Sequence, residues 1–329
     1  MTTKKDIITI YLLLIIELLI LFKSKIIIKN VYETTILFVN SIMPSIFPNM
    51  VISNMMIKQD ISKVIPNKVI NLFNKLFNFN KNVTTLFIIS FLTGSPTNII
   101  NINEYENKGL ITEIEAEYLS YITHFINPLF VISIVGIGIF NSVKIGLFLL
   151  LMQFISNIIK AFIFKNKFNK ATNKTNNVKN KNIIDNFKDS INLSINSILI
   201  IFGIIVMFNI LIVLISNIFK FKFVTNVLIS AFLEITSGIT KFKCLNINYL
   251  LKFFICYIFL NFGGICIHMQ SLSISKNKKI RYLKYLIFRI IWFPKLLNYK
   301  NIFLNPHNSY QIYVLEECNQ IFYQEGFHK

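Results

Sequence analysis

The sequence lacks the motifs that mark the common enzyme classes. It contains no HExxH zinc motif, no GxSxG nucleophile elbow and no Walker A lysine loop. Its cysteines show no CxxC pair and no other spacing typical of metal sites; they are Cys244, Cys256, Cys266 and Cys318. We therefore expect a protein that is not an enzyme and that holds neither a metal ion nor an organic cofactor.

Acidic residues are also scarce. The chain has 15 Asp and Glu against 34 Lys and Arg, which gives a net charge of +19. The basic residues lie between long apolar segments, where the positive-inside rule accounts for them, and abundant Ile, Asn, Lys and Phe are typical of an AT-rich genome. The charge therefore does not indicate a nucleic-acid partner.

What the sequence has in abundance is apolar segments. Hydrophobic residues make up 54% of the 329 residues, and 33 residues are Phe. A soluble domain of this length does not carry so many long apolar runs. We predict an all-α, polytopic helical membrane protein whose natural surroundings are lipid, and the sequence leaves its oligomeric state open, a homo-oligomer included.

The first apolar segment predicts an uncleaved anchor helix within residues 1–30. Lys4 and Lys5 precede it, and no small-residue cleavage site follows it. Glu17 lies inside this segment. An ionisable residue at membrane depth either faces other helices or takes part in proton transfer, and both interpretations are open for Glu17.

The rest of the chain divides into two repeats, residues 31–165 and 191–300. Between them, residues 166–190 predict a basic cytoplasmic linker with no core-forming pattern, and residues 301–329 predict a polar tail. For the first repeat we expect these elements: a helix over 35–57 broken by Pro44 and Pro48, a polar loop over 58–81, a re-entrant hairpin over 84–100, a span over 119–140 broken at Asn127-Pro128, and a span over 143–164.

The second repeat shows a similar order of elements. We expect a span over 191–215, a hairpin over 224–240, a span over 248–271 broken at Asn261-Phe262-Gly263-Gly264, and a short last segment over 280–297. Three crossings and a hairpin invert the second repeat relative to the first. With the linker inside, the inner segments hold 21 Lys and Arg and the outer ones eight, a bias that favours this orientation. The pattern predicts inverted repeats whose hairpin tips meet near the middle of the membrane.

One half of a substrate site is predicted in residues 230–240. This apolar stretch contains the carboxylate of Glu234, the hydroxyl groups of Thr236 and Ser237, and Gly238. We expect Gly238 to let the backbone leave helical geometry beside Glu234. Such backbone inside a bilayer is tolerated only when it is buried in protein or lines a cavity.

The other half is predicted in residues 91–98. Here Thr93, Gly94, Ser95 and Pro96 interrupt an apolar run. We expect Ser95 to be the N-cap and Pro96 the first residue of the helix that follows. The hydroxyl groups of both halves can donate hydrogen bonds to an anion.

Four further polar residues belong to the other interruptions: Asn127, Asn261, His268 and Gln270. Asn127 and Asn261 occupy matching places in the two repeats, and each either binds substrate or satisfies broken backbone. His268 and Gln270 follow the pair Gly263-Gly264, and each either packs between helices or contacts the substrate.

These motifs together resemble a known family. They occur in this order: Pro44-Ser45-Ile46-Phe47-Pro48, Thr93-Gly94-Ser95-Pro96, Asn107-Lys108-Gly109-Leu110-Ile111, Asn127-Pro128-Leu129-Phe130, Glu234-Ile235-Thr236-Ser237-Gly238, and Phe262-Gly263-Gly264 with His268 and Gln270. Over about residues 30 to 300 the chain resembles the sporulation integral membrane proteins of the YlbJ (SpoVV) type. These belong to the Gate or nucleoside-recognition group.

The resemblance implies a transporter in the mother-cell-derived outer forespore membrane, and it implies dipicolinate, a small anion, as the substrate. The chain departs from the family at the first hairpin. The family reads Gly-aromatic-Pro-x-Gly-Ala there, whereas this chain reads Gly94-Ser95-Pro96-Thr97-Asn98-Ile99. Substrate identity therefore stays open.

The charge of Glu234 bears on the substrate. An ionised Glu234 would repel a dicarboxylate, so we expect Glu234 to be neutral, or paired with a cation, when such a substrate is bound. Two other functions are weighed beside transport. One is a non-transporting gate or assembly partner, and the other is a membrane-embedded hydrolase that uses Glu234 and His268.

Overall fold

The computed structural model describes residues 4–168, 182–275 and 280–290, and every regular element in these ranges is helical. The elements of the first part are α1 (Lys4–Phe22), α2 (Ser24–Leu37), a π-helical turn (Phe38–Ile42), α3 (Met43–Lys58), α4 (Asn67–Phe77), α5 (Lys81–Thr93), α6 (Thr97–Asn107), α7 (Glu113–Ile122), a π-helical segment (Phe130–Ile137), α8 (Gly138–Phe140) and α9 (Val143–Ile163). The later elements are α10 (Ile183–Phe219), α11 (Phe223–Leu233), α12 (Ile235–Thr240), α13 (Tyr249–Phe262), α14 (Gly264–Ile274) and α15 (Tyr282–Ile290). Short 3-10 turns cover Ile61–Lys63, Lys165–Lys167 and Lys241–Cys244.

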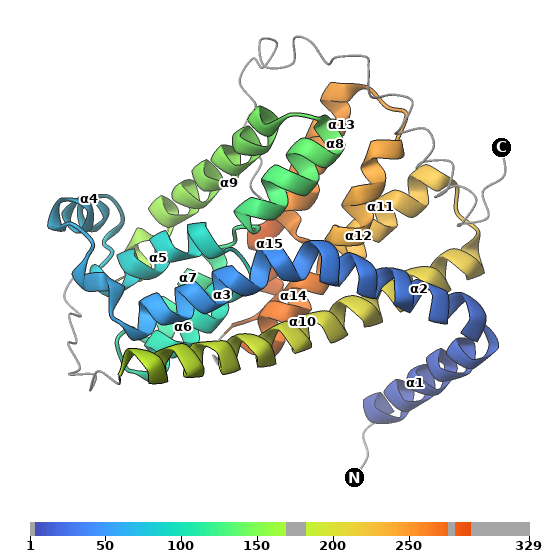
Figure 1. Ribbon diagram of the computed structural model, residues 1–329, viewed down its shortest axis with the longest axis horizontal. Helices are drawn as coiled ribbons and strands as arrows, with labels where there is room; N and C mark the ends of the chain where they lie inside the picture. Colours follow the sequence, from blue (N-terminus) through green and yellow to red (C-terminus); the bar gives the residue numbers. More distant parts are fainter. Residues whose placement is uncertain (1–3, 169–181, 276–279, 291–329) are drawn as a thin grey trace.

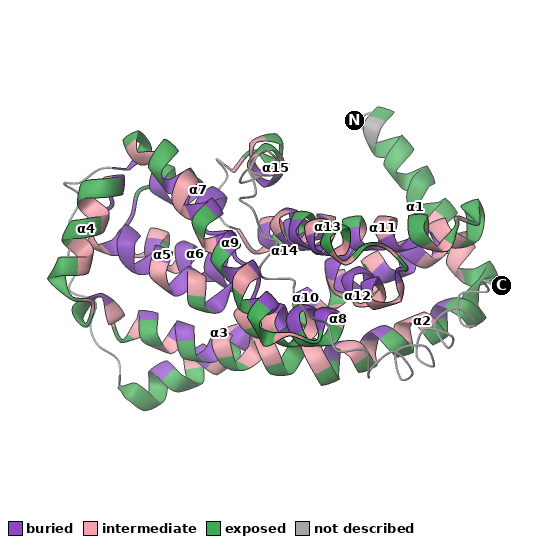
Figure 2. Cartoon of the chain, turned by 90° about the horizontal axis from the view of Figure 1, so that it is seen from above, coloured by how far each residue is buried: buried purple, intermediate pink, exposed green. Residues whose placement is uncertain are grey.

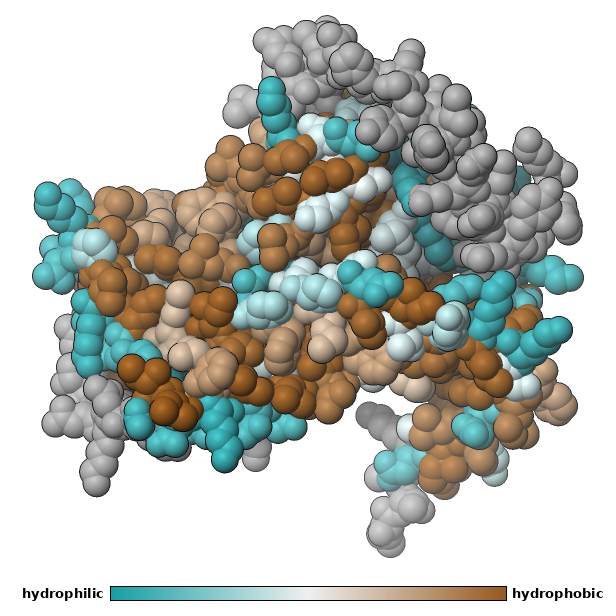
Figure 3. Space-filling view, viewed as in Figure 1, coloured by the Kyte–Doolittle hydropathy of each residue, from teal (hydrophilic) through white to brown (hydrophobic). Residues whose placement is uncertain are grey.

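Four helices of the described ranges are long and apolar enough to cross a membrane: Ser24–Lys58, Val143–Ile163, Ile183–Phe219 and Tyr249–Ile274. A crossing needs ~20 residues, and all four reach or exceed this length. Large apolar side chains stay exposed along them, such as Leu151 on α9 and Leu199 on α10. Figure 3 shows apolar residues over much of one face of the molecule. These lengths and surfaces agree with an integral membrane protein.

The helices form two groups joined by a long pair (Figure 1). Helices α4 to α7 and α9 lie at one end of the molecule, and α11 to α14 lie toward the other. Helix α10 packs along α2 and α3 and runs beside both groups. Its residues Ile198, Ile201 and Ile205 are buried against Phe38 and Ile42 of the first long helix, Ser24–Lys58.

The predicted break at Pro44 and Pro48 is wrong. The helix continues from Ser24 to Lys58, and the π-helical turn Phe38–Ile42 lies directly before Pro44. Proline lacks the N–H that would bond one turn back, and a widened turn accommodates the missing bond. The hydroxyl group of Ser45 donates to the Ile42 carbonyl at 2.9 Å, so this carbonyl has a partner beside the proline.

Two other expectations also change. Residues 58–81 are not a plain loop, because they contain α4, whose Phe77 is buried while Leu72 and Lys75 are exposed. Helix α10 begins at Ile183, within the stretch predicted as linker, and residues 169–181 of that stretch lie outside the described residues.

Helix α1, predicted to be an anchor helix, is exposed over most of its length (Figure 2). It touches the body through Ile16, Leu19 and Ile20, which pack near Ile27 and Ile210. Glu17 is exposed. The interpretation that Glu17 faces other helices of this chain is therefore wrong for the described residues, and a role in proton transfer stays untested.

Candidate functional site

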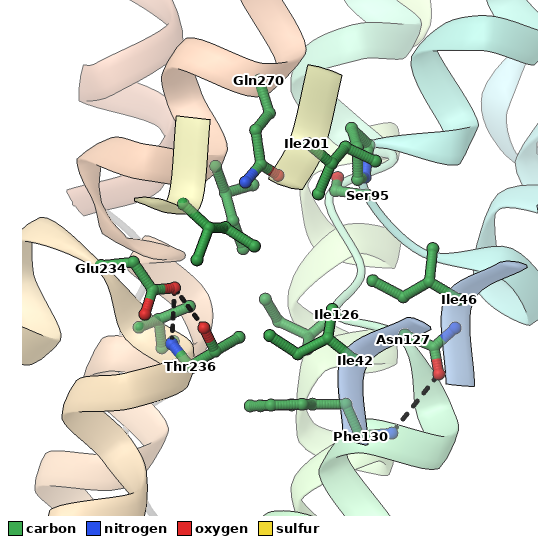
Figure 4. Close-up of a pocket in the computed structure, with 14 residues that line it drawn as sticks. Ile42, Ile46, Ser95, Ile126, Asn127, Phe130, Ile201, Glu234, Thr236 and Gln270 are labelled. Carbon is green, nitrogen blue, oxygen red and sulfur yellow. Dashed lines mark hydrogen bonds between the residues drawn. The ribbon is translucent and has the colours of Figure 1, made fainter. Parts of the chain in front are cut away.

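One cavity lies where interrupted helices from both groups meet. Its lining comes from the first long helix, from the α5–α6 and α11–α12 junctions, from residues 126–130, and from α10 and α14: Ile42, Ile46, Ser95, Pro96, Ile126, Asn127, Phe130, Ile201, Ile205, Glu234, Ile235, Thr236, Ile267 and Gln270. Most of these side chains are aliphatic (Figure 4). Glu234 is the one charged residue of this lining. The two halves of the predicted site therefore share a cavity.

The first interruption separates α5 from α6. Gly94 has φ +74°, and a Cβ there would lie 2.6 Å from the backbone N of Asn127. Only glycine permits both the dihedral and this close approach. The backbone N–H of Ser95 donates to the Phe125 carbonyl at 2.6 Å, so this interruption is fastened to the next one.

The expected capping by Ser95 is wrong. The cap position of α6 is Pro96, and no side chain caps this helix. Ser95 Oγ instead lies 3.0 Å from His124 Nδ1. Thr93 is not part of the cavity lining, and its hydroxyl donates to the Ile89 carbonyl at 3.1 Å.

The second interruption covers residues 123–127, between α7 and the helix that starts at Pro128. Its backbone groups are satisfied by buried amide side chains. Asn98 donates to the Thr123 carbonyl at 2.9 Å, and Asn157 donates to the His124 carbonyl at 2.7 Å. Gln153 Oε1 accepts from the Ile126 N–H at 3.4 Å. Backbone that leaves the helix away from water needs such partners.

Asn127 also satisfies broken backbone. Its Oδ1 accepts from the N–H of Leu129 at 2.9 Å (Figure 4 draws the longer bond from the Phe130 N–H), and its Nδ2 donates to the carbonyl groups of Ser45 and Thr93. Of its two predicted roles, the structure shows the one in backbone capping. Asn127 still lines the cavity, although its amide is engaged.

Glu234 forms the third interruption, and it caps α12. Its backbone is extended, with φ −135° and ψ 109°, and its side chain is only 1% exposed. Oε1 accepts from the N–H and the hydroxyl of Thr236, the first at 2.9 Å, and Oε2 accepts from the N–H of Ser237 at 2.7 Å. The carboxyl group therefore occupies the N-terminus of α12 and takes up the Thr236 hydroxyl that was expected to donate to a substrate anion.

Gly238 is needed for a different reason from the one predicted. It lies inside α12, and the chain leaves helical geometry at Glu234. A Cβ at position 238 would lie 2.2 Å from the backbone N of Ala231, so glycine permits close contact between α11 and α12. Ser237 is not part of the cavity lining, and its hydroxyl donates to Asn209 Oδ1 at 2.8 Å.

The fourth interruption is the pair Gly263-Gly264, with φ +84° and +71°. A Cβ on Gly264 would lie 3.1 Å from the backbone N of Ile235, and one on Gly263 would lie 2.8 Å from His124 Nε2. The pair thus touches both the second and the third interruption. The predicted match between Asn127 and Asn261 is not seen, because Asn261 Nδ2 donates to the Tyr257 carbonyl of its own helix at 2.9 Å.

His268 and Gln270 differ in position. His268 Nε2 lies 2.7 Å from the Phe262 carbonyl oxygen, and its ring lies 5.3 Å from that of Tyr285, outside the cavity lining. Gln270 extends into the cavity (Figure 4), and its hydrogen bond within the described residues goes to Cys266 Sγ at 3.3 Å. Because a thiol is a weak acceptor, Gln270 is the amide most available to a ligand.

Of the predicted residues, six line the cavity: Ser95, Pro96, Asn127, Glu234, Thr236 and Gln270. The others support it from behind or lie apart from it. Sequence reasoning missed the buried partners Asn98, His124, Gln153, Asn157 and Asn209. Only His124 carried a usable signal, as a histidine in an apolar run three residues before Asn127-Pro128.

Comparison of the chain with family models, characterised proteins and solved structures finds no match.

Proposed function

We propose that the protein is a membrane transporter whose substrate occupies the cavity between the four interruptions. The observation that carries this proposal is the convergence of interrupted helices from both groups on one lined cavity. In secondary transporters, discontinuous helices with exposed backbone and polar side chains form the substrate site. An integral protein that only anchors other components has no need for such costly backbone at depth.

The element order supports inverted repeats. Each half has a long helix, Ser24–Lys58 or Ile183–Phe219, followed by two interrupted helices. We propose that the two halves cross the membrane in opposite senses and that the junctions at Gly94 and Glu234 are the tips of re-entrant hairpins. The charge distribution along the sequence supports this orientation.

For the substrate we propose dipicolinate, moved across the outer forespore membrane. This follows from the family resemblance, and the aliphatic side chains of the lining offer apolar contacts to the flat ring of this substrate. The lining holds a carboxyl group and no cationic side chain. An anion would therefore have to enter with a proton or another cation that offsets its charge.

A non-transporting gate is the second candidate, and one observation favours it. The hydroxyl groups of Thr93, Thr236 and Ser237 all bond within the protein. The Ser95 hydroxyl likewise lies 3.0 Å from His124 Nδ1, and the Gln270 amide bonds to the weak acceptor Cys266 Sγ. A protein that only occludes a partner's pathway would show such an internally satisfied lining.

Two measurements test the proposal. Spores lacking this protein should contain little dipicolinate while the mother-cell pool rises, whereas loss of dipicolinate from both compartments would contradict transport. In proteoliposomes, labelled dipicolinate uptake by the wild type should fall at least about fivefold in Gln270→Leu. Asn217→Ala, at an exposed amide on α10, is the matched control and should transport normally. Absence of uptake by inserted, folded wild type would favour the gate.

A further inference from the structure

We infer that Ser95 and His124 form a proton-linked switch for anion binding, in which a proton on His124 turns the Ser95 hydroxyl into a donor toward the cavity. This inference rests on the proposed function and specifies its coupling ion as the proton.

The pair is held rigidly at the cavity wall. Ser95 lines the cavity, and His124 lies behind it, 3% exposed, with Nδ1 3.0 Å from Ser95 Oγ. The Ser95 N–H bonds to the Phe125 carbonyl, and the His124 carbonyl accepts from Asn157. Because both residues are fixed through their backbones, a change in the ring is passed to the hydroxyl group rather than absorbed by movement.

The switch follows from the number of hydrogen-bond donors and acceptors on the two side chains. A serine hydroxyl has one hydrogen and two lone pairs, and a neutral imidazole has one donor and one acceptor nitrogen. When His124 Nδ1 is an acceptor, the Ser95 hydrogen is spent on it and only lone pairs face the cavity. When Nδ1 carries a proton, it donates to Ser95 Oγ, and the hydroxyl hydrogen can turn to a carboxylate.

The other ring nitrogen of His124, Nε2, leaves the tautomer of this histidine free to change. His124 Nε2 is buried and has no hydrogen-bond partner in the described residues, and it faces Gly263 of the fourth interruption. A buried polar atom without a partner is costly and calls for an explanation. No bond at Nε2 fixes the tautomer, and the Ser95 hydroxyl can either donate or accept, so Nδ1 can act as an acceptor or as a donor toward Ser95.

Acidic and basic groups both lie near the Ser95–His124 pair. Glu234 shares the cavity with Ser95, and Lys160 Nζ donates to Asn157 Oδ1 at 2.9 Å, so Lys160 and His124 share Asn157 as a partner. Other charged side chains on α7 and on elements packed against it are Lys81, Glu104, Glu106, Glu113, Glu115, Glu117, Lys144, Lys165, Lys167, Lys284 and Arg289. A proton on His124 offsets the negative charge that an anion adds beside Glu234.

The thermodynamic linkage between anion binding and protonation makes the inference measurable. Anion binding and protonation favour each other by the same factor. Calorimetry of dipicolinate binding to detergent-purified protein, in buffers of different ionisation enthalpy between about pH 6 and 8, should show about one proton taken up per ligand. The dissociation constant should rise about tenfold per pH unit. Ser95→Ala and His124→Gln should lose the proton uptake, whereas Ser95→Thr and Glu234→Gln should retain it.

Each of the other possible outcomes would contradict a specific part of this inference. Wild-type binding without proton uptake leaves transport standing and removes the switch. If proton uptake is lost in Glu234→Gln but kept in His124→Gln, the proton binds to Glu234 and not to His124.

If the wild type binds no dipicolinate, the proposed substrate is wrong, and NMR of ¹⁵N-histidine-labelled wild type still decides the switch. The Nδ1 signal of His124 should move as the pH is lowered, and Ser95→Ala should change its position. An Nδ1 that keeps or lacks its proton throughout contradicts the inference.

Discussion

The two halves of the chain stabilise the non-helical backbone at their helix interruptions by different means. In the first half, the backbone of residues 123–127 bonds to amide side chains from two neighbouring helices, Asn98 on α6 and Gln153 and Asn157 on α9. In the second half, Glu234 caps α12 with its own carboxyl group, and Gly238 and Gly264 let backbones touch. The first arrangement is a network, and the second relies on one cap and on close contact.

This difference has an energetic consequence. A network satisfies broken backbone with several buried hydrogen bonds worth about 1 kcal/mol each, so removing a polar side chain from it lowers stability. A contact without room for a methyl group does not tolerate an added side chain. We therefore expect the second half to be the more sensitive to small changes of side-chain size and the first to changes of polarity.

The largest effect is expected for Gly238→Ala. Its Cβ would lie 2.2 Å from the Ala231 backbone N, and neither backbone can yield without parting α11 from α12. We expect a loss of about 3 kcal/mol or more, seen as loss of monodisperse protein in size-exclusion chromatography and a lowered melting temperature.

Gly203→Ala is the matched control for Gly238→Ala, because a Cβ at Gly203 on α10 meets nothing within 4 Å. It should be neutral or slightly stabilising, since alanine is the better helix former. Equal melting temperatures for the two variants would show that α11 and α12 are not in close contact.

A smaller effect is expected for Asn157→Leu in the first half. The His124 carbonyl would lose its donor at 2.7 Å, and a buried unsatisfied acceptor costs about 2 kcal/mol. Thermal unfolding in detergent measures the loss. Asn217→Leu, whose amide bonds only to Val213 on an exposed face, should change little. Similar losses for both would mean that leucine disturbs helices in general.

Glu234→Ala should cost about 1 kcal/mol, as expected for loss of an N-cap. Gln keeps an acceptor oxygen, so Glu234→Gln should recover part of the loss. The ratio of this loss to that of Asn157→Leu directly compares the two halves. A loss in Glu234→Ala above that of Gly238→Ala would show that the cap, rather than close contact, holds the second half together.

The smallest effect is expected at Asp60, outside the membrane-spanning helices. Burial alone would raise the pKa of Asp60, but hydrogen bonds from Ser62 and Lys63 lower it below its usual value. A carboxyl group with a lowered folded pKa stabilises the protein above its unfolded pKa of about 3.9, and this stability is lost as pH falls through the folded value.

Asp60→Asn should therefore lower stability at neutral pH by less than about 0.5 kcal/mol, because the site is partly exposed. The difference from wild type should shrink as the pH falls below the unfolded pKa of about 3.9 in pH-dependent melting experiments. A difference that grows on acidification would have the wrong sign and would assign the stabilisation to another group.

Much of this architecture could be predicted from the sequence, because its cause is local. Apolar length determines which segments can be spanning helices, and Gly94, Asn127-Pro128 and Gly263-Gly264 each impose a local change that the structure shows. Local chemistry also misled. Pro44 and Pro48 predicted a break, but a helix packed along α10 accommodates them with one π-helical turn.

Only the tertiary structure decided which side chains face the cavity. Ser95 and Ser237 are both hydroxyls next to an interruption, yet one lines the cavity and the other bonds to Asn209 of α10. Their directions depend on how four interruptions pack together, and that packing joins residues such as Ser95 and His124 that are 29 positions apart. A single sequence records the local preference for leaving a helix, whereas the partner that satisfies the freed backbone comes from a distant segment and is fixed by packing.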